Sequence, residues 1–152
     1  MIMAWTTVAF GKYRGMSLPQ IIFNDTDYFF WLCENNAFPS ERLAAEAKEI
    51  NHKARTIKIP SSYLNMKVQY TILNGFEHMT LVPVEQPNHT GSSRVIFRDC
   101  FDMSMARKFG AYAKKSNEIL VQGIKRFLFG SENTRMTKKR CEQFFDDDSN
   151  FT

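Results

Sequence analysis

The stretch MKVQYTILNGF, residues 66–76, decides the fold class of this chain. From Met66 to Ile72, apolar residues alternate with polar ones, which is the two-residue period of a strand with one buried face. Asn74-Gly75 follows, a dipeptide favoured in two-residue hairpin turns because both residues tolerate positive φ. We therefore predict an antiparallel hairpin whose return strand spans residues 76–84.

The residues after this hairpin predict a loop, a third strand and a long helix. Residues 85–93 are rich in Pro, Asn, Gly and Ser, as exposed loops are, and residues 94–101 return to strand composition. Residues 103–129 change to helical spacing, and Gly130 is well placed to end that helix. The apolar side of the helix would be formed by Ile119, Leu120, Ile124, Phe127 and Leu128.

The residues before the hairpin predict a strand and then helices. Residues 5–10 have strand composition and run into a glycine-bounded turn at residues 11–15. Ser17 and Gln20 form a capping box for a short helix, and Asp25 can cap a second helical stretch after it. A further helix restarts at Pro39-Ser40 and carries an amphipathic pattern to about residue 55.

Together these segments predict an α+β fold with one core. A chain of 152 residues is long enough for a single domain, which we place at residues 1–130. Residues 1–55 would form an N-terminal strand-helix-helix module, and residues 56–130 a small antiparallel sheet plus the long helix. Residues 131–152 are polar, first basic and then acidic, and predict a mobile charged tail.

Composition narrows the class of protein. The formal charge is +4, which favours acidic partners, and the aromatic fraction of 14% is high. We find no apolar run of about 18 residues and no secretory leader, so we expect a cytoplasmic protein, in the host cytoplasm if the chain is viral. The three cysteines are far apart and without metal-ligand spacing. We expect no metal and no cofactor.

A motif near the N-terminus carries a family resemblance. It runs FGKYRG over residues 10–15, followed by Ser17-Leu18, Asp27-Tyr28 and Trp31-Leu32. This pattern resembles the small module at the C-terminus of exodeoxyribonuclease X-like proteins, which also occurs in short bacterial and phage proteins such as a family labelled as a quorum-sensing-regulated virulence factor. Arg14 stands where that pattern usually has a second lysine. The resemblance implies an accessory module of DNA-processing or phage proteins, without nuclease carboxylates.

The same residues have a physical interpretation. A tight turn between two glycines exposes backbone N–H groups, Lys12 and Arg14 add positive charge, and the helix after Ser17 points its positive dipole end toward an anion. Tyr13 would stack on a base. The alternative is that Phe10, Tyr13 and Trp31 pack a small core while both cations are solvated.

Two further basic clusters are candidates for nucleic-acid contact. The first surrounds the start of the long helix, and the second lies near the chain end. Each would bind phosphate with a steep dependence on salt. The alternatives are a solvated helix face for the first cluster and a disordered solubilising tail for the second. The residues are Arg107, Lys108, Lys114 and Lys115 in the first cluster, and Arg135, Lys138, Lys139 and Arg140 in the second.

The final acidic stretch resembles the tip of bacterial and phage single-stranded-DNA-binding proteins, which docks on replication and repair enzymes. Here Thr152 follows the last Phe, so the ring is not on the terminal carboxylate. Alternatives are that the aspartates fold back on residues 138–140 and screen them, or that the acidity has no role. The candidate partner-binding residues are Phe144, Phe145, Asp146, Asp147, Asp148 and Phe151.

Catalysis is the least supported class. The three histidines are scattered, and no metalloprotease, nucleophile-elbow or P-loop motif is present. Asp99 and Asp102, with Glu77 or Glu85, would suit a metal-dependent nuclease, although Asp102 is more simply a helix cap. We therefore expect a non-catalytic accessory protein that binds nucleic acid, DNA rather than RNA. The alternative is a factor that binds a replication, transcription or nuclease enzyme.

Overall fold

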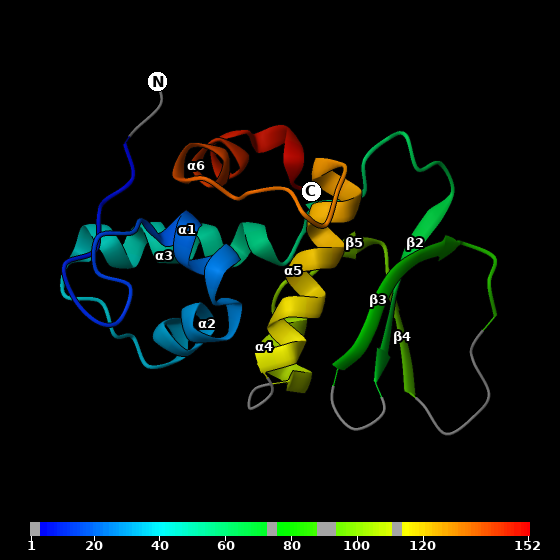
Figure 1. The fold of residues 1–152 in the computed structure, drawn as a ribbon, viewed down its shortest axis with the longest axis horizontal. Coiled ribbons are helices and arrows are strands. Elements are labelled where there is room, and N and C mark those ends of the chain that lie inside the picture. The colour runs from blue at the N-terminus through cyan, green and yellow to red at the C-terminus, as the bar shows by residue number, and fades with distance from the viewer. Residues whose placement is uncertain (1–3, 73–75, 88–93, 111–113) are drawn as a thin grey trace.

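The computed structural model describes residues 4–72, 76–87, 94–110 and 114–152 and confirms the α+β fold class (Figure 1). A group of helices lies on one side of a small antiparallel sheet, and the N-terminal region is helical. Within the described residues, no helix is long and apolar enough to cross a membrane.

Three helices follow the N-terminal segment, and local capping sets where they begin. They are α1 (Leu18–Asn24), α2 (Thr26–Glu34) and α3 (Glu41–Ala54). The Gln20 side chain accepts a hydrogen bond from the Ser17 N–H at 3.0 Å, as predicted. Asp25 accepts from the Tyr28 N–H, which confirms the predicted cap, and Ser40 accepts from the Leu43 N–H at the start of the third helix.

The predicted N-terminal strand is reduced to an isolated bridge between Thr7 and Ser17. The Val8 N–H donates to the Met16 carbonyl, and the Gly15 N–H donates to the Val8 carbonyl. Gly15, at φ +95°, turns the chain back tightly, so α1 begins before a longer ladder can form.

The sheet is built around β2 (Met66–Ile72), with β3 (Phe76–Pro83) and β4 (Arg94–Arg98) antiparallel on its two sides. Tyr70 pairs with Met79 on one side and with Ile96 on the other. The hairpin and the third strand are therefore confirmed, whereas the predicted Asn74-Gly75 turn lies outside the described residues. A second pair joins β1 (Ile57–Lys58) to β5 (Cys100–Phe101).

The predicted helical region is confirmed as two helices, α4 (Met105–Gly110) and α5 (Lys114–Phe129), with Gly130 at φ +86° just after the second. Helix α5 packs on β3. The approach is close because Gly123 has no side chain, and a Cβ there would overlap Met79 Cε.

The prediction of a mobile tail over residues 131–152 is wrong. Residues Lys138–Asp146 form helix α6, and a short 3-10 turn, η1 (Asp148–Asn150), follows it. Helix α6 packs against α1, and Phe144, Phe145 and Phe151 are 6%, 0% and 7% exposed. Their rings surround Phe23 of α1 or one another at centroid distances of 5.3–5.9 Å. The segment is ordered because these rings complete the core.

Candidate nucleic-acid interface

The FGKYRG turn packs closely against α2. Gly11 has φ +70°, and a Cβ built on it would lie 2.7 Å from the Tyr28 hydroxyl oxygen. Both the backbone conformation and the close approach therefore require glycine at this position. Gly15, which ends the turn, also has positive φ but faces open space.

Asp25, which sequence reasoning identified only as a cap, joins the turn to α2. Its carboxylate accepts from the Tyr28 N–H at 3.2 Å and from the Tyr13 hydroxyl at 2.7 Å, and it pairs with Lys12 Nζ at 3.0 Å. Burial alone would raise the pKa of Asp25, but the hydrogen bonds from Tyr13 and Lys12 outweigh it, and the pKa is lowered. Burial, with the bond to Asp25, raises the pKa of Tyr13 to about 12. The carboxylate therefore stays ionised and the phenol neutral at physiological pH.

Three aromatic rings and a lysine side chain are grouped next to Asp25. The Tyr28 and Trp31 rings are stacked with centroids 6.0 Å apart and planes at 12°, while the Tyr13 ring meets Tyr28 edge-on at 5.4 Å. Lys12 Nζ lies 4.8 Å from the Tyr28 centroid and 5.2 Å from that of Tyr13. Arg14 is exposed at the same turn. We call Lys12, Tyr13, Arg14, Tyr28 and Trp31 the N-terminal aromatic site.

The two sequence interpretations of this motif each hold for some of its residues. Phe10 and Tyr13 are half-buried against the core, as the packing alternative expected. Trp31 is 42% exposed, whereas Leu32, the next residue of α2, is 1% exposed. The packing alternative placed Trp31 in the core with Phe10 and Tyr13, so Trp31 was not foreseen as a surface ring. The signal available was the i, i+3 spacing of Tyr28 and Trp31, which stacks two rings along a helix.

One residue of the first basic cluster, Arg107, forms internal ion pairs. Arg107 of α4 contacts Glu34 through Nε and Asp27 through Nη1, each at 3.0 Å, and so ties α4 to α2. These bonds raise the pKa of Arg107 further above its usual value. Lys108 and Lys115 are exposed, and the Lys114 side chain lies outside the described part of the structure. Both ion pairs of Arg107 are therefore internal to the fold, and its guanidinium is not a free phosphate contact.

The second basic cluster begins helix α6 and is not part of a tail. Arg135, Lys138, Lys139 and Arg140 are all exposed, and Arg140 Nη1 donates to the Arg135 carbonyl. Residues 138–140 form the first turn of α6, where the helix dipole is also positive. The cluster therefore remains a solvent-facing region of positive potential.

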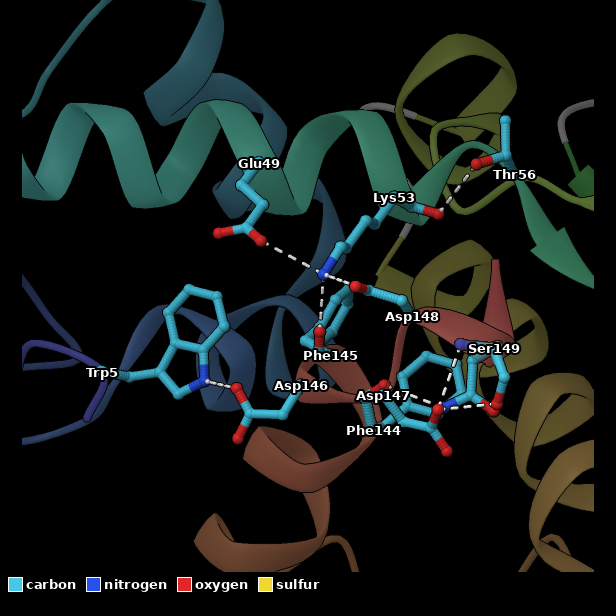
Figure 2. A network of polar contacts seen from close by, with 11 residues as sticks. Trp5, Glu49, Lys53, Thr56, Phe144, Phe145, Asp146, Asp147, Asp148 and Ser149 are labelled. Carbon is cyan, nitrogen blue, oxygen red and sulfur yellow. Dashed lines mark hydrogen bonds and ion pairs between the residues drawn. The ribbon is translucent and has the colours of Figure 1, made fainter. Parts of the chain in front are cut away.

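The acidic stretch is held against the rest of the molecule by contacts with distant residues (Figure 2). Asp146 accepts a hydrogen bond from Trp5 Nε1 at 3.0 Å, and Asp148 pairs with Lys53 Nζ at 2.9 Å. Lys53 also contacts Glu49 at 3.1 Å and the Phe145 carbonyl at 2.9 Å. The aspartates do fold back, but onto α3 and Trp5, so the predicted screening of residues 138–140 is wrong.

The candidate partner-binding rings are not available as a docking tip. Phe151 stacks on Phe145, its backbone bridges to Ile57, and the Thr152 N–H donates to the Thr56 carbonyl at 2.9 Å. Asp147 is used locally, because it caps η1 through the Ser149 N–H and hydroxyl. The rings of this stretch therefore belong to the core of the fold.

A pocket of about 420 Å³ lies between Trp5, α3 and the acidic stretch. Its charged lining consists of two cations and four carboxylates, Arg42, Lys53, Glu46, Glu49, Asp146 and Asp148. This excess of negative charge is not complementary to phosphate, so the pocket is not part of a nucleic-acid interface.

Asp102, one of the residues considered for catalysis, has a structural contact. Asp102 Oδ1 accepts from the Ser104 N–H and hydroxyl just before α4, close to the capping role that sequence reasoning preferred. Within the described ranges, no group of three or more His, Cys, Asp or Glu side chains is placed to hold a metal ion. Cys33, Cys100 and Cys141 are free thiols, and burial raises the pKa of each to about 11, 11 and 12. They are therefore poor nucleophiles at neutral pH.

Comparison of the chain with protein-family models, curated proteins and solved structures gives no match. The resemblance of residues 10–32 to the exodeoxyribonuclease X-like module accordingly stays a prediction.

Proposed function

We propose that the protein is a non-catalytic accessory factor that binds nucleic acid through the N-terminal aromatic site. The observation that carries this proposal is the exposure of Trp31, which is 42% exposed and stacked on Tyr28. The Lys12 ammonium lies over the Tyr28 ring. An exposed, pre-stacked indole offers a flat face to an unpaired base, and each such stack contributes roughly 1–3 kcal/mol.

The cations of the site can reach a phosphate at small cost. The Lys12 side chain is 58% exposed although it pairs with the half-buried Asp25, and that carboxylate keeps its hydrogen bonds from the Tyr13 hydroxyl and the Tyr28 N–H when Lys12 turns to a ligand. Arg14 is exposed at the same turn. A base on Trp31 with its neighbouring phosphate near Lys12 and Arg14 therefore matches the chemistry of the site.

The site is also held in shape before any ligand arrives. Gly11 lets the turn approach Tyr28, and Asp25 binds Lys12, Tyr13 and the start of α2 together. Such preorganisation lowers the entropy lost on binding. Tyr13, predicted to stack on a base, is half-buried and meets the Tyr28 ring edge-on, which supports the position of Tyr28.

The resemblance of the motif supports a role in bacterial or phage DNA metabolism, with DNA as the expected polymer. The alternative role, binding an enzyme through the acidic tip, has lost its docking element because Phe144, Phe145 and Phe151 are buried.

Fluorescence anisotropy of labelled single-stranded and duplex oligonucleotides, titrated at two salt concentrations, tests the proposal. Trp31→Ala should weaken single-strand binding about tenfold, the middle of the range for one lost stack. Leu64→Ala is the matched control, because Leu64 is an exposed apolar side chain (77%) far from the site in sequence. Binding that Trp31→Ala leaves unchanged, or a wild-type chain that binds no oligonucleotide at low salt, would overturn the proposal.

A further inference from the structure

The three-stranded sheet has one face that the helices do not cover. The alternation of the strands and their register place eight side chains on this face. Those of β2 are Lys67, Gln69 and Thr71, those of β3 are His78, Thr80 and Val82, and those of β4 are Val95 and Phe97. We call these eight residues the outer face.

The core lies entirely on the opposite side of the sheet. Val68, Tyr70 and Met79 are buried there, and the half-buried Met66 and Ile96 pack against the core. Three apolar residues of the outer face, Val82, Val95 and Phe97, are half-buried. Among the described residues, none of these three packs against the core. In Figure 1 the helices lie to the left of the sheet, and α5 contacts β3 from that side.

The chemistry of the outer face is cationic and aromatic. Lys67 Nζ lies 3.7 Å from the centroid of the Phe97 ring and also donates to the Gln86 carbonyl at 2.8 Å. His78 is exposed on the neighbouring strand. The eight residues include no carboxylate, and Glu85 and Asp99 follow the ends of β3 and β4, while the side chain of Glu77, next to His78 in β3, lies outside the described part of the structure. Gln69, Thr71 and Thr80 add hydrogen-bonding groups between the strands.

We propose that the outer face is a second contact surface for single-stranded nucleic acid, with Phe97 as its stacking residue and Lys67 as its phosphate contact. This inference rests on the proposed function, since it assigns a further surface to the same polymer. Lys67 and Phe97 are both half-buried, and the long lysine side chain is flexible, so its ammonium can move to a phosphate while a base takes its place on the ring. A base must be unpaired to lie on the ring, which favours single strands over duplex.

The charge of the outer face favours nucleic acid as its ligand. A sheet face that carries a lysine and no carboxylate is complementary to a polyanion, whereas a face built for a second protein commonly has a larger apolar centre. Here Phe97, Val82 and Val95 are on different strands or at different ends of a strand, and polar side chains separate them.

Amide chemical-shift mapping on the full-length ¹⁵N-labelled chain tests this, with an oligothymidylate of about ten nucleotides, within the usual site sizes. We expect shifts at β2 and β4 amides with the single strand and much smaller ones with a duplex of equal length. Equal shifts with the duplex would overturn the inference. Shifts of the same amides with protein concentration alone would show a second copy on this face and would also overturn it.

Substitutions then separate this surface from the N-terminal aromatic site. Phe97→Ala and Lys67→Ala should each weaken single-strand affinity about fivefold or more, and Lys67→Ala should reduce the salt slope by about one. Lys58→Ala, at an exposed lysine of β1, is the control for lost charge. If only Trp31→Ala weakens binding, the outer face is not a contact surface while the proposed function stands. If only Phe97→Ala and Lys67→Ala weaken it, this inference stands and the N-terminal site falls.

Phe97→Leu covers the case in which Phe97→Ala disturbs the strand. It keeps an apolar side chain and removes the ring, so it should bind as weakly as Phe97→Ala while its melt matches that of the wild type. Wild-type affinity of a folded Phe97→Leu chain would overturn the stacking role.

Discussion

Trp5 Nε1 donates a 3.0 Å hydrogen bond to Asp146, which joins residues 141 positions apart in the chain. Close to this bond, Lys53 of α3 binds the Phe145 carbonyl and Asp148 (Figure 2). The beginning of the described chain, the third helix and the final segment are thus fastened together. The acidic stretch, which sequence reasoning assigned to a partner, is an integral part of the fold.

We first predict that Phe145→Ala destabilises the whole domain. The ring is fully buried between Phe23, Phe144 and Phe151, and truncating such a ring costs about 3–5 kcal/mol in the free energy of unfolding. Urea unfolding followed by circular dichroism measures this. Gln143→Ala, at an exposed position of the same helix, should change stability by no more than about 0.5 kcal/mol. A mobile tail would leave both variants at wild-type stability.

A second prediction compares two glycines of one turn. Gly11 and Gly15 both have positive φ, so alanine at either position carries the backbone cost, about 1 kcal/mol. Only at Gly11 would the new Cβ also collide with the Tyr28 hydroxyl. Gly11→Ala should therefore lower the thermal midpoint more than Gly15→Ala, and adding Tyr28→Phe should recover part of the difference. Equal losses in the two single variants would mean that the turn does not press on α2.

The third prediction concerns acid stability. The pKa of Asp25 is lowered in the folded protein, so its stabilising contribution is complete above its unfolded value, near 3.8, and is lost as pH falls through the folded value. Asp25→Asn should lower stability at pH 7 and flatten the loss of stability below about pH 4. Urea unfolding of both chains at a series of pH values measures the two slopes. Parallel slopes would show that Asp25 titrates normally.

The fourth prediction separates the charge of the N-terminal aromatic site from its structure. Arg14→Glu should weaken oligonucleotide binding while leaving the thermal melt unchanged, because Arg14 is exposed at the turn. Lys12→Glu should weaken binding and also lower the melting temperature, because it places a second carboxylate beside Asp25. Anisotropy titration paired with a circular-dichroism melt gives both readouts. A lowered melt for Arg14→Glu would assign that residue to the fold.

Signals confined to a few neighbouring residues were enough to predict much of this fold. The alternation from Met66 to Ile72 fixed the central strand, and Gln20, Asp25 and Ser40 marked the helix starts. Each of these depends on contacts within four residues or on a simple period, which a sequence displays directly.

The errors came from contacts between distant residues. Phe144, Phe145 and Phe151 have polar neighbours in the sequence, which is typical of a tail, whereas in the fold Phe144 and Phe145 pack on the ring of Phe23 in α1. Arg107 was counted as a free cation because its partners, Asp27 and Glu34, are 80 and 73 positions away. In the candidate site, the exposure of Trp31 depends on how α2 is rotated against the core, which periodicity alone does not determine.

The docking of the last residues also bears on how the molecule folds as it is synthesised. A ribosome delivers α1, α2 and α3 first, yet Phe23 and Ile57 wait for Phe144 and Phe151, which emerge much later. The helical half consequently keeps apolar surface uncovered through most of translation, a state in which nascent chains depend on chaperones. The contacts of the native core can all form only after residue 151 has been synthesised.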